Sequence, residues 1–198
     1  MTCIAALKYR CPKTKKTHII VGSESLTTLE STKLVNICNE SKIITFPNFT
    51  VLVAGDGPVV DALEYIKMDV DGPYDWNYHT INNRQDCIAF VTHFVEMFQE
   101  RAPETNGEDL KYEFLISDGE KIWWAISGPS VFEIGTFWAS GSGSSYAIGY
   151  LEAIIDYCDD RGIDPDEISK LVVGSLKEKL EAEAQRNNLL PKSASLFA

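Results

Sequence analysis

The chain has 198 residues, enough for one sizeable domain with a well-filled core or for two small ones. Its 29 acidic and 18 basic residues give a formal net charge of −11, which repels phosphate backbones, so nucleic acid is not an expected partner. The N-terminus lacks the charged-then-apolar layout of a signal peptide, and no apolar run approaches the roughly 20 residues of a membrane helix. A soluble, cytoplasmic protein without a membrane contact is therefore expected.

Short stretches rich in β-branched or small apolar residues predict four strands early in the chain. They fall at residues 2–9, 17–25, 41–46 and 49–55. The polar, proline-containing segment 10–16 suits the tip of a first hairpin, and Pro47 with Asn48 suits the tight turn of a second. The first half of the chain thus opens with antiparallel strand pairs.

Two helices are predicted next from apolar residues that recur every three to four positions. In 59–70 these residues are Val60, Leu63, Ile66 and Val70, and in 84–100 they are Ile88, Val91, Val95 and Phe98. Pro58 suits the first turn of the former helix.

The second half repeats this order. Residues 112–127 predict a hairpin around the turn signal Asp118-Gly119, and 130–142 supply more β-rich sequence. Helical periodicity then returns in 144–160 and in 164–185, while 191–198 are expected to form a loose tail.

The predicted order is strands, two helices, strands and two helices. This order does not show the regular alternation of strand and helix that a parallel βαβ sheet requires. The order therefore predicts an antiparallel α+β fold in a single domain over 1–198, with two sheets face to face and helices outside.

Several residue types are better explained by structure than by chemistry. The histidines His18, His79 and His93 are scattered, and a lone histidine on a helix is usually packed or solvated. The aromatic residues Trp123, Trp124, Phe137 and Trp138 are predicted to be core or sheet-contact residues. Five cysteines, Cys3, Cys11, Cys38, Cys87 and Cys158, include no C-x-x-C pair, so they predict reduced thiols rather than a disulfide framework or a metal site.

Two features do point to chemistry. The stretch "ASGSGSSYAIGYLEA" places a Gly-Ser-Gly-Ser loop between a strand and a helix, where backbone amides suit an anion or oxyanion, although such a loop alone is typical of a helix N-cap. Thr2 directly follows Met1, and as the N-terminal residue it would carry both a nucleophile and an amine base.

With these features in order, the chain resembles the proteasome β-type family of N-terminal nucleophile (Ntn) hydrolases, which includes the bacterial proteasome-like peptidases. "MTCIAAL" is similar to the family's Met-Thr start, "IIVGSES" to its second strand, and "SKIITFPNFTVLVAGDGPVVDALEYI" to its lysine, hairpin, Ala-Gly-Gly and helix. The Gly-Ser-Gly loop and the hairpin before it resemble later family motifs, so the likeness spans roughly residues 2–153. The resemblance implies a four-layer αββα sandwich of two antiparallel sheets flanked by helices.

The resemblance also implies site residues. Thr2 is the nucleophile after removal of Met1, with its own α-amine or a bridging water as base. Lys42 matches the lysine that lowers the pKa of the threonine hydroxyl, and Lys33 is an alternative for that role with a less suitable spacing.

Three more residues are matched in the same way. Glu24 falls where the family has an aspartate beside the lysine, and Ser142 matches the serine that hydrogen-bonds near the amine. Gly55 falls in the loop that donates an amide to the oxyanion. By itself, a pairing of Lys42 with Glu24 would be an ordinary surface ion pair worth roughly 0–1 kcal/mol.

The implied function is that of a threonine endopeptidase that cleaves peptides or unfolded proteins inside a homo-oligomeric ring, without a cofactor and with an ATPase unfoldase as a possible partner. The alternative is a catalytically inactive ring or scaffold subunit of the same fold. Two departures from the family pattern favour the alternative: Glu24 replaces the aspartate, and 170–198 contain neither the family's Asp nor its Ser-Gly-Gly.

Overall fold

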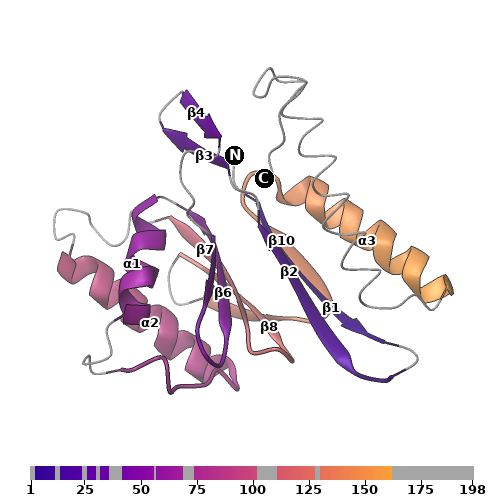
Figure 1. The fold of residues 1–198 in the computed structure, drawn as a ribbon, viewed down its shortest axis with the longest axis horizontal. Coiled ribbons are helices and arrows are strands. Elements are labelled where there is room, and N and C mark those ends of the chain that lie inside the picture. Colours follow the sequence, from indigo (N-terminus) through magenta and orange to yellow (C-terminus); the bar gives the residue numbers. More distant parts are fainter. Residues whose placement is uncertain are drawn as a thin grey trace.

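The computed structural model describes residues 3–11, 14–23, 26–29, 32–35, 42–55, 57–68, 74–101, 111–127 and 130–161 (Figure 1). In chain order the elements are β1 (Ile4–Arg10), β2 (Thr17–Ser23), β3 (Leu26–Leu29), β4 (Thr32–Val35), β5 (Ile43–Thr45), β6 (Thr50–Gly55), α1 (Gly57–Met68), α2 (Arg84–Arg101), β7 (Tyr112–Ser117), β8 (Ile122–Ile126), β9 (Ser130–Ile134), β10 (Phe137–Ser140) and α3 (Ser144–Arg161). The predicted helix over 164–185 and the tail at 191–198 lie outside the described residues.

The described strands form two larger antiparallel sheets and one small ladder. The first sheet has the order β10-β1-β2, and the second has the order β5-β6-β7-β8-β9. This confirms the predicted α+β class with two antiparallel sheets. The separate β3–β4 ladder, in which Leu26 pairs with Val35, was not predicted.

Two of the predicted turns, at Pro47-Asn48 and at Asp118-Gly119, are confirmed by hydrogen bonds. Around Pro47 and Asn48, the amide of Phe46 donates to the carbonyl of Phe49 at 2.8 Å. In the β7–β8 hairpin, the Asp118 carboxylate accepts hydrogen bonds from the amides of Glu120 and Lys121, and Gly119 has the positive φ of 91° that favours glycine. Both turns are formed by residues close in sequence, so the local sequence pattern was sufficient to predict them.

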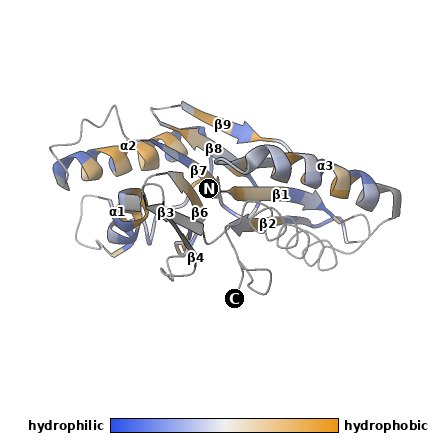
Figure 2. Cartoon of the chain, turned by 90° about the horizontal axis from the view of Figure 1, so that it is seen from above, coloured by the Kyte–Doolittle hydropathy of each residue, from blue (hydrophilic) through white to orange (hydrophobic). Residues whose placement is uncertain are grey.

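Helices cover one face of each large sheet. Figures 1 and 2 show α1 and α2 against the five-stranded sheet and α3 against the three-stranded sheet. The buried line of α2 consists of Cys87, Phe90, Val91, Phe94 and Phe98. Ile88 and Val95 are only partly buried, so the predicted stripe was displaced around the helix, because the three phenylalanines and the thiol take the central positions.

The other faces of the two sheets pack against each other. Ile4 and Ala6 of β1 share an apolar cluster with Leu52 of β6 and Leu115 of β7. All four are essentially inaccessible to solvent, and fully burying one leucine-sized side chain contributes roughly 1.5–3 kcal/mol. This apolar layer holds the two sheets together, and the residues of the candidate site lie at the ends of β6 and β10.

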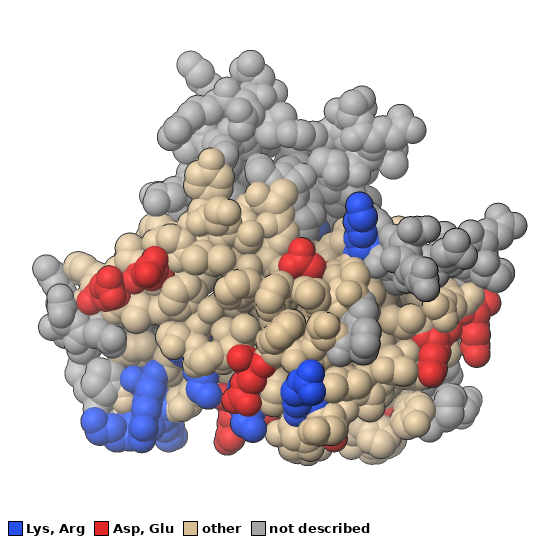
Figure 3. Space-filling view, turned by 180° about the vertical axis from the view of Figure 1, so that it is seen from behind, with Lys and Arg blue, Asp and Glu red and all other residues tan. Residues whose placement is uncertain are grey.

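The charged groups lie mainly at the periphery. Arg10, Lys15 and Lys16 at the tip of the β1–β2 hairpin are exposed, and Figure 3 shows basic side chains gathered at that corner. Within the ranges given above, no helix combines the length and hydropathy required to cross a membrane.

Candidate functional site

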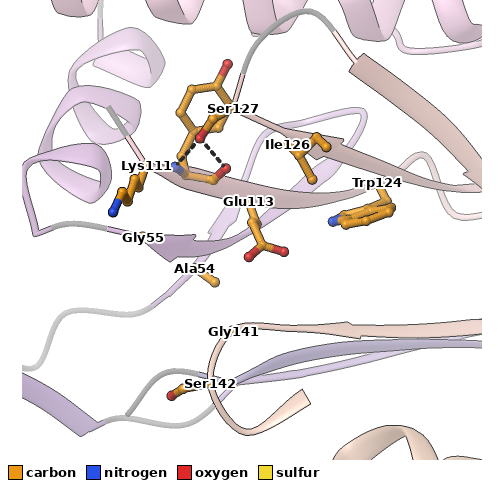
Figure 4. Close-up of a pocket in the computed structure, with 10 residues that line it drawn as sticks. Ala54, Gly55, Lys111, Glu113, Trp124, Ile126, Ser127, Gly141 and Ser142 are labelled. Atoms are coloured by element: carbon orange, nitrogen blue, oxygen red, sulfur yellow. Dashed lines mark hydrogen bonds between the residues drawn. The ribbon is translucent and has the colours of Figure 1, made fainter. Parts of the chain in front are cut away.

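A cavity of about 670 Å³ opens between the ends of the two sheets (Figure 4). The described residues that line it from the five-stranded sheet are Ala54, Gly55, Lys111, Tyr112, Glu113, Trp124, Ile126 and Ser127. Gly141 and Ser142, which follow β10, line it from the other sheet. Two residues that the sequence placed in the site, Gly55 and Ser142, therefore share one cavity.

Gly55 ends β6 at a point of close backbone approach. A Cβ on Gly55 would lie 2.6 Å from the carbonyl oxygen of Lys111 and 3.1 Å from Cα of Tyr112. Backbone atoms this near leave no room for a side chain, so the position requires glycine in this fold.

The Gly-Ser-Gly segment forms the turn between β10 and α3. Gly141 has φ of 90°, and its carbonyl accepts a hydrogen bond from the amide of Ser144 at 3.0 Å. A Cβ on Gly143 would lie 3.0 Å from Cβ of Cys3, so the turn rests directly on the start of β1. The pairing of β1 with β10 is consistent with this contact, because Ile4, the residue after Cys3, pairs with Ser140.

Lys42 immediately precedes β5 and is hydrogen-bonded to β6. It is half-buried, and its carbonyl accepts a hydrogen bond from the amide of Val53 at 2.9 Å. It is not one of the described residues that line the cavity, although Val53 immediately precedes the lining residue Ala54. The alternative, Lys33, lies in β4 opposite Thr28, in the small separate ladder.

The remaining two site predictions, Thr2 and Glu24, lie outside the described residues. The nearest described neighbour of Thr2 in the sequence is Cys3, whose side chain is buried under the Gly143 turn.

Sequence reasoning missed a carboxylate in the cavity. Glu113 lies on β7 opposite Ala54, and its carboxylate accepts a hydrogen bond from the hydroxyl of Ser140 on β10. Ser140 is only 2 % exposed. Strand alternation could have found the residue, since Glu113 and Leu115 share a face and Leu115 belongs to the layer between the sheets. The signal was weak because β7 is buried on both faces, so its apolar residues do not alternate with polar ones.

The outer wall of the cavity is fixed by Ser127. Its hydroxyl accepts a hydrogen bond from the Tyr112 amide at 2.8 Å and donates one to the Tyr112 carbonyl at 3.1 Å, as the dashed lines in Figure 4 show. These bonds tie the start of β7 to the end of β8, so Glu113 projects from a rigid edge.

The described residues that line the cavity offer hydroxyls, backbone amides, the carboxylate of Glu113 and the ammonium of Lys111. Among the described residues no three His, Cys, Asp or Glu side chains are grouped so that they could hold a metal ion. Gly55 and Gly141 line the cavity without side chains, so backbone groups there are accessible to a ligand, as sites for an oxyanion or a peptide require.

Solved structures of similar fold match most of the chain. Thiobacillus denitrificans BPH superposes with a TM-score of 0.67 at 20 % identity, covering 89 % of this chain and 90 % of that one. Its complex with Epoxomicin gives a TM-score of 0.68 at 18 % identity over the same shares. The chain has the proteasome β-type fold.

More distant structures agree with this fold. Eukaryotic HslV from Trypanosoma brucei gives a TM-score of 0.54 at 14 % identity, covering 87 % of this chain and 88 % of that one. Anbu, an ancestral β-subunit from Yersinia bercovieri, gives 0.57 at 12 % identity, covering 77 % and 65 %. The sequence resemblance to proteasome β-type subunits is thus confirmed at the level of the fold.

Sequence comparison adds one match of a different kind. A family model described as phage late-transcription coactivator matches residues 144–197, and no curated protein matches the chain. The part of this match at 144–161 is α3, whose residues Ala147, Leu151 and Ile154 pack on the three-stranded sheet. This described part is therefore an integral helix of the proteasome-like fold.

Proposed function

We propose that the protein is a threonine-type peptidase with the four-layer αββα architecture of Ntn hydrolases, and that Thr2 is its nucleophile once Met1 has been removed. The observation that carries the proposal is the convergence of Gly55 and Ser142 on one cavity, with Cys3, the neighbour of Thr2, directly beneath the adjoining turn.

Chain connectivity supports the assignment of Thr2. Consecutive Cα atoms are about 3.8 Å apart, so the Cα of Thr2 lies within that distance of the Cα of Cys3. Ile4 and Ala6, at the start of β1, face the layer between the two sheets. The proposal requires the hydroxyl of Thr2 to reach the cavity.

The reaction divides into two steps. The Thr2 hydroxyl oxygen attacks the carbonyl carbon of the scissile peptide bond while its proton passes to the α-amine, directly or through water. The C–N bond then breaks, the departing amine takes that proton, and an acyl ester stays on Thr2. Water attacks the ester in the same way, releasing the acid and restoring the hydroxyl.

The other residues have supporting roles in this proposal. Lys42 stabilises the deprotonated hydroxyl of Thr2, with Glu24 as its carboxylate partner. Ser142 hydrogen-bonds near the amine, and the amide at Gly55 donates to the oxyanion, an interaction typically worth several kcal/mol in the transition state.

Intact-mass analysis tests the proposal directly. We expect protein purified from cells to have lost one methionine and to gain one inhibitor mass after incubation with epoxomicin. Thr2→Ala should abolish both the adduct and peptide hydrolysis, whereas Thr2→Ser should retain an adduct. Retained Met1, or a processed chain that forms no adduct, would instead support the inactive ring or scaffold subunit.

A further inference from the structure

Among the described residues that line the cavity, Glu113 has a carboxylate that the proposed peptidase reaction does not use. Its neighbours on the inward faces of the sheets, such as Leu52, Leu115 and Ile122, are fully buried and apolar. A carboxylate at the edge of such a layer is costly unless charge or hydrogen bonds compensate it. Glu113 is half-buried beside this layer, so its charge would attract a cation bound in the cavity.

Ser140 supplies only part of that compensation. Its hydroxyl donates one hydrogen bond to Glu113, and Ser140 carries no charge. A carboxylate offers about four acceptor positions, so most of its capacity is open to a ligand. Figure 4 shows the Glu113 side chain extending from β7 into the space between the sheets, on the side of Gly141.

The walls around Glu113 suit a cation with an apolar stem. Trp124 and Ile126 line the same cavity, and both lie on the neighbouring strand β8. The Trp124 ring is held by Trp138, with ring centroids 4.7 Å apart, and by Phe132 at 5.6 Å. An aromatic ring beside a carboxylate favours a guanidinium, which is planar and weakly hydrated, over a compact ammonium.

Lys111, the basic residue among the described residues that line the cavity, does not oppose the binding of a cation at Glu113. Lys111 is exposed and lies at the rim, and in Figure 4 its side chain points away from the Glu113 carboxylate. Among the described lining residues, Glu113 is therefore the charged side chain that points into the space between the sheets. We propose that this cavity is a subsite for a cationic side chain of a peptide, preferring arginine, with Glu113 as the specificity-determining residue. This inference rests on the proposed peptidase function for its biological meaning.

A binding experiment tests the subsite without any turnover. The full chain with Thr2→Ala is titrated with N-acetyl-arginine amide and with its neutral analogue N-acetyl-citrulline amide, and followed calorimetrically and by the tryptophan indole N–H resonances. We expect the arginine amide alone to bind and to shift the Trp124 resonance. Trp76, in the core on the far side of the five-stranded sheet, should not shift.

Matched carboxylate variants locate the effect. Glu113→Gln keeps an acceptor for Ser140 and should weaken arginine amide binding about tenfold or more, the loss of one charge-assisted hydrogen bond. Glu133→Gln makes the same change in net charge at an exposed position opposite Trp123, and should leave the affinity unchanged. Equal weakening by both variants, or no shift of Trp124 in the parent protein, would overturn the subsite.

Hydrolysis by the chain with Thr2 intact separates the two proposals. Glu113-dependent binding without peptide cleavage would support the subsite and contradict the peptidase. Cleavage with an epoxomicin adduct, but with equal rates for matched arginine and citrulline peptides and no arginine amide binding, would support the peptidase and overturn the subsite. If Glu113→Gln does not fold, the indole shifts of the parent protein and the two peptide rates still decide.

Discussion

Gly55 shows how strongly a single position can be constrained by its neighbours. Replacing it with alanine places a Cβ against the Lys111 carbonyl oxygen, 2.6 Å away, so the edges of β6 and β7 must separate. We expect Gly55→Ala to lower the free energy of unfolding by about 1–3 kcal/mol, as overpacking does. Urea denaturation measures this. Gly22→Ala is the matched strand control, because nothing lies within 4 Å of its added Cβ, and an equal loss there would contradict the steric explanation.

The buried thiol of Cys87 is expected to make the stability of the fold depend on pH. Burial raises the pKa of the Cys87 thiol well above its ordinary value, and the carboxylates of Asp86 and Asp118 raise it further. The neutral thiol therefore favours the folded state. That contribution is fully present below the unfolded thiol's pKa of about 8.5 and is lost as the pH rises above it.

Above that pH the thiol's contribution should fall by up to about 1.4 kcal/mol per pH unit. Cys87→Ala should remove this part of the alkaline slope, as urea titrations between pH 8 and pH 10 would show. The native thiol should also resist iodoacetamide at pH 8 and react once the chain is unfolded. Rapid modification of Cys87 in the folded protein would count against the assigned burial.

At the scale of elements, the segment before α2 is tied to that helix by one buried hydrogen bond. The indole N–H of Trp76 donates to Nδ1 of His93 at 2.7 Å, and the two side chains are 3 % and 6 % exposed. Trp76→Phe should cost about 1–3 kcal/mol of stability, since it leaves a buried acceptor without its donor, in addition to the lost contact area.

A double-mutant cycle with His93→Phe isolates this bond from the packing change. The double variant should be more stable than the sum of the two single losses implies. Additive losses, measured by thermal or urea denaturation, would show that the hydrogen bond contributes nothing.

The elements also show what local sequence can predict. The hairpins around Pro47 and Asp118 and the three described helices follow from turn residues and periodicity, because their contacts are close in sequence. The pairing of β1 with β10 joins Ile4 to Ser140 across most of the chain, and no local pattern specifies it. Glu113 was not predicted for the same reason, because its contact with Ser140 joins two strands that are distant in sequence.

At the scale of the whole molecule, exposed aromatic residues favour assembly. Tyr146 and Tyr157 on α3 are 63 % and 47 % exposed, and aromatic residues are enriched at subunit contacts. We propose a homo-oligomeric ring in the cytoplasm, with an ATPase unfoldase as its partner. Native mass spectrometry should give one closed multiple of the 22.1 kDa chain, and Tyr146→Glu with Tyr157→Glu should dissociate it. A monomer at micromolar concentration would contradict the ring.

The contact between Gly143 and Cys3 has a consequence for the evolution of this chain. Because a Cβ at position 143 would lie 3.0 Å from the Cβ of Cys3, the two positions share one small volume. Relatives that place any side chain at 143 are expected to have glycine at 3 or a displaced first strand. Those that keep glycine at 143 are free to vary residue 3 among small apolar types. Covariation between positions 3 and 143 in such relatives would therefore reflect the steric contact between the start of β1 and the turn before α3.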